Sequence, residues 1–549
     1  MPVAVGTPSH PKRGTRPVRI ANCSGGQMDP GWQMKKQASL GPVDVLTGDW
    51  LAENNLAQEA IKIENGTGEG FKDNAWDALQ QSMGIIVEKR LKVVINGGGL
   101  KPQTLAERCQ ELVDKNNYPL TVAYVYGDNM AAQSENVLAC NAYLGARGIV
   151  KALENGADIV IWGRVADASP VVGAAWWWYG WKDTEYDQLA GAFVTGHLVE
   201  CCAYVSGSNF SGFTRFPMET FIDSGFPIAE IHADGSSVIT KHEGTNGMVT
   251  VDTVKSQLIY EIQGNIYLNS DVSAVLDGIV IKQEGKDRVR VTGAKGRPPP
   301  PTTKLAIYYR GGYESQHLGN AAGYATKQKY ALYEKQLRAR LAEQGLIDHV
   351  GTAKKNPHTQ FEATTYFRTF AQAATPEPIL KLKMLISDET LQHFSGFHWA
   401  EDQRTSDPRT FYVYYPCVIA QDDIEEGANI LGTGGKIVST HPSTRPPEPN
   451  INCGIFVERP EMWEWFRSFM TMDRMKQLIG GDWKDEYRIE RVEFPAIYAV
   501  HFVMYGMLGR GVSSSSLLDN RGKGFTDYIR AKHIEVPEQF LQWAYTGDE

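Results

Sequence analysis

A guanidinium, a carboxylate and a hydroxyl follow one apolar segment of the chain within a few residues. Arg164, Asp167 and Ser169 come directly after residues 159–163, whose composition predicts a buried strand. Side chains at the carboxyl end of a parallel strand collect where α/β proteins bind their ligands. Arg164 can hold an anion through two N–H groups, and Asp167 can move a proton or cap the next helix. The segment therefore predicts part of a ligand site.

A glycine-rich turn joins a predicted strand at residues 92–95 to a predicted helix at residues 102–115. It contains Asn96, Gly97 and Gly98. Glycines let a backbone approach a ligand, and a helix N-terminus offers free N–H groups to an anion. A carboxylate or phosphate fits this pattern, and a tight turn without a ligand is the alternative. The spacing matches neither the dinucleotide-binding nor the phosphate-loop motif.

A second loop of small residues, Ser24, Gly25 and Gly26, follows the first predicted strand. Ser24 or the preceding Cys23 could act as a nucleophile only with a neighbouring base, and the local sequence contains none. We therefore favour a loop that cradles substrate.

Two aspartates, Asp49 and Asp128, each follow a glycine at the end of a predicted strand. Such residues commonly cap a helix. Together with Asp167 they could instead converge to bind a metal ion or to divide acid and base roles. The sequence leaves the metal requirement open.

Two further groups contain proton-transfer side chains. His197 and Glu200 share one face of a predicted helix, where they form metal ligands, an acid/base pair or a structural hydrogen bond. Lys241, His242 and Thr245 lie in a polar loop beside two glycines, a combination suited to proton transfer and anion binding.

Alternating strands and helices over the first 205 residues predict an α/β fold with a parallel βα-type N-terminal domain, either doubly wound or barrel-like. A helix is predicted around residues 138–155. From about residue 206 an antiparallel extension follows, including a hairpin at residues 274–293. The C-terminal elements match a small ferredoxin-like α+β domain. We expect a disordered tail at 1–17, an α/β domain at 18–430 and a ferredoxin-like domain at 436–549.

The composition is that of a soluble globular protein long enough for more than one domain. Hydrophobic residues make up 42% and charged residues 22% of the 549 residues, and the net charge of −9 argues against binding nucleic acid. Seven scattered cysteines predict reduced thiols and a cytoplasmic location. The densest apolar stretch, residues 171–181, is too short to span a membrane. We expect a homo-oligomer without a membrane partner, acting on a small-molecule substrate.

Several segments together resemble the acyclic terpene utilisation (AtuA-like) family from about residue 18 onward, and residues 516–523 resemble its appended ferredoxin-fold domain. Two places depart from the family pattern: the loop at residues 24–29, and residues 443–449, which replace an Arg-Ser-Gly-Asp-Lys-Gly signature. The segments that carry the resemblance are residues 45–53, 96–99, 163–169, 196–201, 226–230, 240–245 and 290–296.

The resemblance implies a branched terpenoid acid as substrate, handled as its CoA thioester; we identify no separate cofactor. We expect an enzyme that uses general acid/base chemistry, of the hydro-lyase or C–C lyase type. Arg164 and the glycine loop would hold the anion, while Asp167, His197 or His242 would move the proton beside the positive charge of Lys241. One alternative is a hydrolase with Ser24 or Cys23 as nucleophile. Another is a non-catalytic subunit that binds an acyl-CoA-processing partner through the ferredoxin-like domain.

Overall fold

The computed structural model divides the chain into two compact units. One comprises Met1–Ile307, Tyr415–Leu508 and Arg521–Glu549, and the other comprises Tyr308–Tyr414 and Gly509–Asn520. The sequence prediction places most of both units in a single domain at 18–430. The residues that the structure describes are 13–130, 136–208, 210–340, 346–350, 353–388, 391–399, 404–432, 435–439, 450–508, 519 and 522–543.

Among the described residues, eleven strands form the main sheet of the first unit. Its central strands are parallel, in the order β1 (Val18–Asn22), β2 (Val45–Gly48), β3 (Lys92–Ile95), β6 (Ile159–Ile161) and β4 (Val122–Tyr126). Antiparallel strands extend both edges: β7 (Pro227–Ile231), β8 (Ser237–Lys241), β12 (Arg288–Thr292) and β11 (Val280–Gly285) beyond β1, and β19 (Glu426–Ile430) and β20 (Gly435–Ser439) beyond β4. The fold is thus mixed α/β with an open sheet, and the predicted hairpin is formed by β11 and β12.

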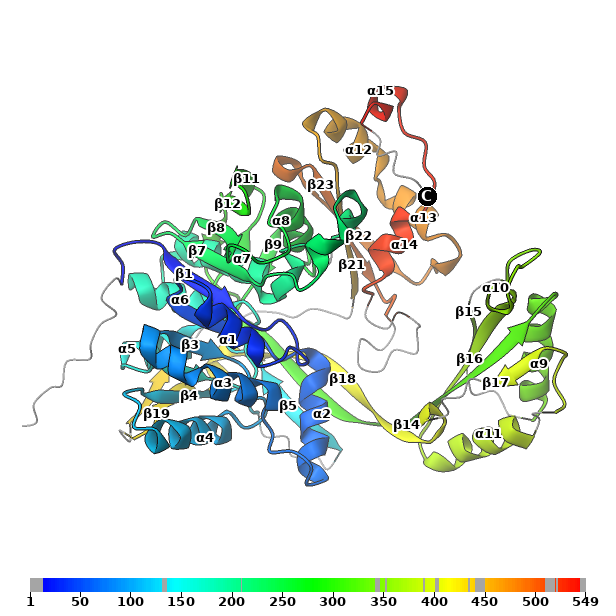
Figure 1. Ribbon diagram of the computed structural model, residues 1–549, viewed down its shortest axis with the longest axis horizontal. Coiled ribbons are helices and arrows are strands. Elements are labelled where there is room, and N and C mark those ends of the chain that lie inside the picture. The colour runs from blue at the N-terminus through cyan, green and yellow to red at the C-terminus, as the bar shows by residue number, and fades with distance from the viewer. Residues whose placement is uncertain are drawn as a thin grey trace, which may run out of the picture. The chain divides into compact units, whose positions relative to one another are not determined.

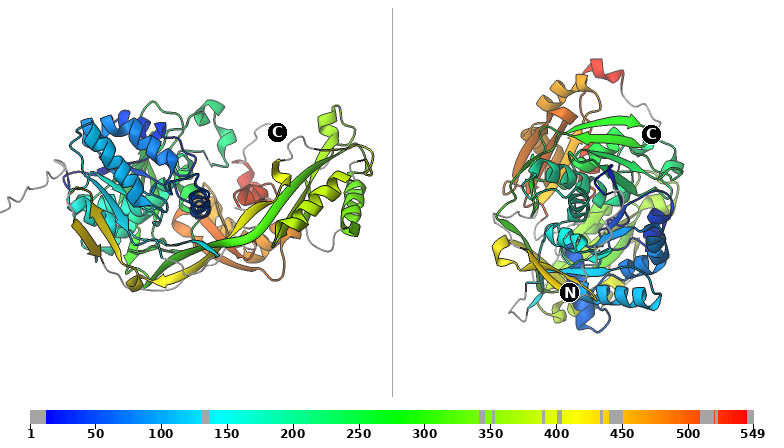
Figure 2. Two further views of the ribbon diagram at one scale, coloured as in Figure 1. Left: turned by 90° about the horizontal axis from the view of Figure 1, so that it is seen from below. Right: turned by 90° about the vertical axis from the view of Figure 1, so that its left-hand side faces the viewer.

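Helices cover both faces of the parallel strands (Figures 1 and 2). Val93 and Ile95 pack with one hydrophobic core, whereas Val94 between them packs with the other. This alternation follows from the opposite directions of successive side chains in a strand, and it explains why the strands are apolar throughout. The first core includes α1 (Trp32–Ser39), α3 (Asp73–Lys89) and α4 (Pro102–Lys115), and the second includes α5 (Arg147–Glu154), α6 (Ser169–Tyr179) and α7 (Tyr186–Glu200).

The helix predicted around residues 138–155 is wrong over its first half. That segment forms strand β5 (Val137–Ala142), and α5 begins only at Arg147. The backbone N–H of Tyr143 donates to the carbonyl of Lys304 at 2.8 Å, so a partner distant in sequence keeps the segment extended. The N-terminus of α5 is held by two buried carboxylates: Asp271 accepts from the N–H of Ala146 and Glu426 accepts from the N–H of Gly148.

The C-terminal domain contains a three-stranded antiparallel sheet in the order β21 (Asn450–Phe456), β23 (Ala499–Tyr505) and β22 (Arg488–Phe494). Its Phe494 and Ile497 belong to the same hydrophobic core as Leu258 and Ile259 of the α/β domain. Its described helices include α12 (Trp463–Phe469), α13 (Met472–Ile479) and α14 (Phe525–Arg530).

The second unit contains its own sheet and core. Tyr333, Phe367 and Leu382 are buried there, between the sheet and two helices. Its described elements include parts of β14 (Thr302–Ala322) and β18 (Arg409–Ala420), together with β15 (Leu346–Val350), β16 (Thr364–Ala373), β17 (Phe397–Trp399), α9 (Thr326–Arg340) and α11 (Pro376–Asp388).

Most of the expected disordered tail, residues 1–12, lies outside the described residues. Residues 13–17 pack on the sheet: Arg16 donates to both carboxylate oxygens of Asp44 at 2.6 and 2.7 Å, and Arg13 donates to the carbonyl of Trp177 at 2.8 Å. All seven cysteines are free thiols. Within the described part of the chain, no helix combines the length and apolar character needed to cross a membrane.

A buried histidine makes the stability of the C-terminal domain depend on pH. His501 in β23 is fully buried, and neither ring nitrogen has a hydrogen-bond partner among the described residues. Burial lowers its pKa from 6.5 to about 4. The unfolded chain therefore binds a proton that the folded chain resists, so this contribution to stability is present above pH 6.5 and is lost as pH falls towards about 4.

We predict that His501→Leu reduces the loss of stability between pH 7 and pH 5 by roughly 2 kcal/mol. Urea unfolding at both pH values checks this, with His358→Leu as a control because His358 is exposed. An equal pH effect in wild type and His501→Leu contradicts the prediction.

Candidate functional site

Each parallel strand of the main sheet is followed by a polar residue at the same edge. Asp49 and Asn96 directly follow β2 and β3. Ser24 and Asp128 lie two residues after β1 and β4, and Arg164 lies three residues after β6. The connection from β3 to β4 passes over β6, and the chain then returns through α5 to form β6. Such a reversal of strand order is where open α/β sheets bind ligands. The predicted strand-end residues therefore share one edge of the sheet.

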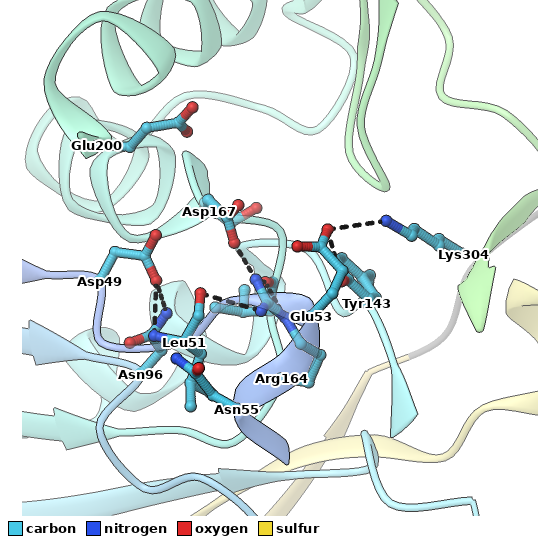
Figure 3. Close-up of polar contacts among 12 residues, drawn as sticks. Asp49, Leu51, Glu53, Asn55, Asn96, Tyr143, Arg164, Asp167, Glu200 and Lys304 are labelled. Carbon is cyan, nitrogen blue, oxygen red and sulfur yellow. Dashed lines mark hydrogen bonds and ion pairs between the residues drawn. The ribbon is translucent and has the colours of Figure 1, made fainter. Parts of the chain in front are cut away.

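Arg164 is the centre of a buried polar network (Figure 3). Its Nε and Nη2 donate to the carbonyl of Val165 at 2.9 and 2.7 Å, and its Nη1 donates to the carbonyl of Leu51 at 3.2 Å. Nη2 also pairs with Asp167, and the guanidinium lies over the Tyr143 ring at 4.3 Å. Because these donors face protein acceptors, the geometry suits a positioning role for Arg164 better than the anion-binding role expected from sequence.

The backbone of Arg164 connects the network to β4. Its N–H donates to Oδ2 of Asp128 at 2.8 Å, and Asn141 donates to the same oxygen at 2.9 Å. Burial raises the pKa of Asp128 to about 6, although these hydrogen bonds favour the ionised form. Asp128 thus aligns the ends of β4 and β6.

Asp49 is buried at the end of β2. Its Oδ1 accepts from the side-chain amide of Asn96 and from the N–H of Leu51, and Asn96 in turn accepts from the N–H of Trp50 at 2.7 Å. Burial raises the pKa of Asp49 to about 7, against the opposing effects of Arg164 and Asn96. A carboxyl group that titrates near neutral pH can both donate and accept a proton.

Glu53 has the opposite character, although it lies only one helical turn away at the start of α2 (Glu53–Glu64). Lys304 lies 3.1 Å from its Oε1, and the hydroxyl of Tyr143 donates to the same oxygen at 3.3 Å. The Lys304 ammonium lowers the pKa of Glu53 to about 2, and Arg164 contributes to this effect against burial. Asp49 and Glu53 therefore have widely separated proton affinities, a pattern typical of divided acid and base roles.

Glu200 and His197 form a buried pair at the end of α7. Nδ1 of His197 lies 3.1 Å from Oε1 of Glu200, and Nε2 lies 3.2 Å from the carbonyl of Leu258. Burial opposes the imidazolium, but the charge of Glu200 raises the pKa of His197, because an acceptor faces each ring nitrogen. His197 therefore orients Glu200.

The second carboxylate oxygen of Glu200 has no such partner. Oε2 is buried and makes no hydrogen bond to any described residue. In Figure 3, Glu200 lies apart from the hydrogen bonds and ion pairs that join Asp49 and Asp167 to the rest of the network. Buried polar atoms are almost always satisfied, so an unpaired carboxylate oxygen indicates a place for a ligand or a proton.

Other protein atoms pack directly against the glycines of both loops. A Cβ at Gly98 would lie 2.2 Å from the Trp162 carbonyl, and one at Gly97 would lie 2.2 Å from Cβ of Ala75. A Cβ at Gly25 would lie 2.7 Å from the backbone of Cys201. These glycines are needed for close packing at the strand ends, which favours the tight-turn interpretation over an anion cradle.

The serine hydroxyls predicted to contact substrate form hydrogen bonds with nearby protein groups. Ser24 donates to the carbonyls of Asp49 and Gly26 at 2.9 and 3.0 Å, and Ser169 accepts from Asn269 at 3.1 Å. Both serines are fully buried. They shape the strand ends from within.

Lys241, His242 and Thr245 bond mainly within their own loop and to neighbouring segments. The Lys241 ammonium donates to the Thr245 carbonyl at 2.8 Å and lies 3.4 Å from Asp287, and Nε2 of His242 lies 3.0 Å from the Gln37 carbonyl. Burial lowers the pKa of His242. The polar side chains of this loop are thus paired with one another and with the neighbouring segments.

Several residues of the network were missed by sequence reasoning. Tyr143 was hidden inside the wrongly predicted helix, and Lys304 follows a proline-rich connector without any motif. Glu53, four residues after Asp49, offered the only detectable signal. Among the described residues, no group of three or more His, Cys, Asp or Glu side chains is placed to hold a metal ion.

We predict that Arg164→Ala lowers the free energy of unfolding by about 3 kcal/mol, because it leaves buried carbonyls and carboxylates without their donor. Chemical denaturation checks this, with Arg108→Ala as control, since Arg108 pairs with Glu69 at the surface. Similar stability of the two variants contradicts a positioning role.

Comparison with known proteins agrees with this organisation. The model of the acyclic terpene utilisation family protein AtuA matches residues 18–430, and the model of the AtuA ferredoxin-like domain matches residues 449–535. The searches of curated proteins and of solved structures gave no match. The first family match spans well over half of the sequence, so the chain belongs to the acyclic terpene utilisation (AtuA) family and carries its ferredoxin-like domain.

Proposed function

We propose that this protein is an enzyme of the lyase type that acts on a branched or terpenoid-like carboxylic acid or its acyl thioester. The observation that carries the proposal is the set of carboxyl groups at the strand ends. Asp49 has its pKa raised to about 7 and Glu53 has its pKa lowered to about 2. Glu200 adds a buried oxygen without a partner among the described residues.

These groups suit a dehydration or its reverse. Glu200 would take the proton from the carbon next to the carbonyl, and Asp49 would give a proton to the leaving hydroxyl on the neighbouring carbon. Breaking the C–H and C–O bonds in this way forms one C=C bond and releases water. A retro-aldol cleavage needs the same carboxylate to remove a hydroxyl proton, so the geometry accommodates both reaction types.

The surroundings support a branched apolar substrate. Tyr267 is stacked on Phe193 with ring centroids 4.4 Å apart, and it meets His197 edge-on at 5.1 Å. Tyr143 lies under both Arg164 and Lys304. Aromatic faces bind apolar groups, and the membership of a terpene-utilisation family points to the same chemical class.

The hydrolase alternative has less support. Ser24 donates to two backbone carbonyls, and its other polar neighbour is the Asp29 carboxylate at 3.3 Å. Burial raises the pKa of the Cys23 thiol well above its usual value, which keeps the thiol protonated and weakly nucleophilic.

We predict that the protein exchanges the α-proton of a branched 3-hydroxyacyl-CoA or its unsaturated product with deuterium in D2O, measured by NMR. Glu200→Gln and Asp49→Asn should each slow exchange or turnover by on the order of 100-fold, because each removes a proton-transfer group. Asp183→Asn, at an exposed position, serves as the matched control. Unchanged rates in both site variants contradict the proposal.

We also predict that kcat/KM falls as pH rises through about 7, because Asp49 must carry its proton to act as an acid. Asp49→Asn should remove this descending limb from the residual activity. A wild-type profile that is flat between about pH 6 and about pH 8 would exclude Asp49 as the acid.

A further inference from the structure

A lysine of the ferredoxin-like domain lies beside the carboxyl groups of the α/β domain. Nζ of Lys523 is 2.6 Å from Oε1 of Glu261 and also bonds to the hydroxyl of Tyr260. Tyr260 and Glu261 lie just after the end of α8 (Val251–Leu258). The carbonyl of Leu258, the last residue of α8, faces His197. The two matched domains therefore meet next to the candidate site.

Buried contacts fix this meeting of the domains. Phe494 and Ile497 share a hydrophobic core with Ile259, and a Cβ at Gly454 would lie 2.5 Å from Ile259. Lys255 lies over the ring of Tyr498 at 5.2 Å. These contacts pack the ferredoxin-like domain against α8 and the residues that follow it.

Glu261 is held in an unusual state. Its φ of 59° lies in the left-handed region, which non-glycine residues rarely adopt and which clusters at functional sites. Desolvation and the charges of Glu53 and Glu200 raise the pKa of Glu261 to about 8, although 51% of its side-chain surface is accessible to solvent. The charges of His197 and Lys304 act in the opposite direction.

The carboxylates of the candidate site also affect the pKa of Lys523. Burial lowers its pKa, while Cys201, Glu53 and Glu200 act to raise it. Its side chain nevertheless keeps 43% of its surface accessible to solvent. By contrast, the Arg164 guanidinium is fully buried and Lys304 is paired with Glu53.

We propose that Lys523 is the substrate-binding cation of this site, holding the carboxylate of a branched acid, and that Glu261 occupies it in the absence of substrate. The inference rests on the proposed function for its location, because it assigns the anion-binding group of that same site. When substrate binds, its carboxylate replaces that of Glu261 beside the ammonium. The ferredoxin-like domain would thereby supply a residue that determines substrate specificity.

The test uses the full chain and 3-methylbut-2-enoate, a branched carboxylate, with its uncharged primary amide as the comparison ligand, both measured by titration calorimetry. Lys523→Ala should weaken carboxylate binding by about 10- to 100-fold, the effect of losing one charge-assisted hydrogen bond. Amide binding should not change, and Lys523→Arg should retain most of the affinity. Lys484→Ala is the control, because Lys484 belongs to the ferredoxin-like domain, as Lys523 does, but pairs with Glu486 within that domain.

Glu261→Gln separates a binding role from a structural one. Both Glu261→Gln and Lys523→Ala break the ion pair between the domains. If Lys523 binds substrate, Glu261→Gln should bind the carboxylate several-fold more tightly, because no carboxyl group of the protein then competes for the ammonium. Equal weakening of carboxylate and amide binding in both variants overturns the inference, as does unchanged carboxylate binding in Lys523→Ala.

The same proteins distinguish this inference from the proposed function. Lys523-dependent carboxylate binding without any α-proton exchange would support the binding site and exclude the lyase chemistry. Exchange that depends on Asp49 and Glu200, with carboxylate binding indifferent to Lys523, would retain the enzyme and overturn the inference. Failure of the wild-type chain to bind the carboxylate would also overturn it.

Discussion

The buried guanidinium of Arg164 is the constraint on which the strand-end geometry depends. A charge at that depth is stable only when acceptors surround it, and here they come from Leu51, Val165 and Asp167. Meeting this requirement fixes the loop after β2 against the loop after β6. The N–H of the same residue holds Asp128 and so aligns β4. The carboxyl groups can face one another because this cation organises the loops that carry them.

The same arrangement explains why neighbouring carboxyl groups differ in proton affinity. Glu53 faces the Lys304 ammonium directly, so ionisation is favoured despite burial. At Asp49 the effect of burial on the pKa exceeds the opposing effects of Arg164 and Asn96, and the charge of Glu200 raises the pKa further. Glu200 in turn is oriented by His197. Fixed cations at two points of one network are therefore enough to give neighbouring carboxyl groups widely different pKa values.

The sequence predicts the strand ends well because a strand covered on both faces must be apolar throughout, so that the first polar residue marks its end. It fails for β5, whose composition suits a helix equally and whose conformation depends on a partner segment near Lys304. Tyr143 and Lys304 were missed for the same reason, since only that pairing brings them to Glu53. The second compact unit is likewise defined by contacts distant in sequence.

Among the described residues, Asp49, Asp128 and Glu53 lie near the carboxyl edge of the parallel sheet, where the cations Arg164 and Lys304 are already paired. Arg164 donates its hydrogen bonds to the loops around it, and Lys304 forms an ion pair with Glu53. A substrate that is itself an acid would be repelled by such an edge unless another element supplied positive charge. The ferredoxin-like domain packs against α8 through a shared core and brings Lys523 to this place. Under the proposal for Lys523, the ferredoxin-like domain balances the charge of the site, which gives a physical reason for the two domains to occur in one chain.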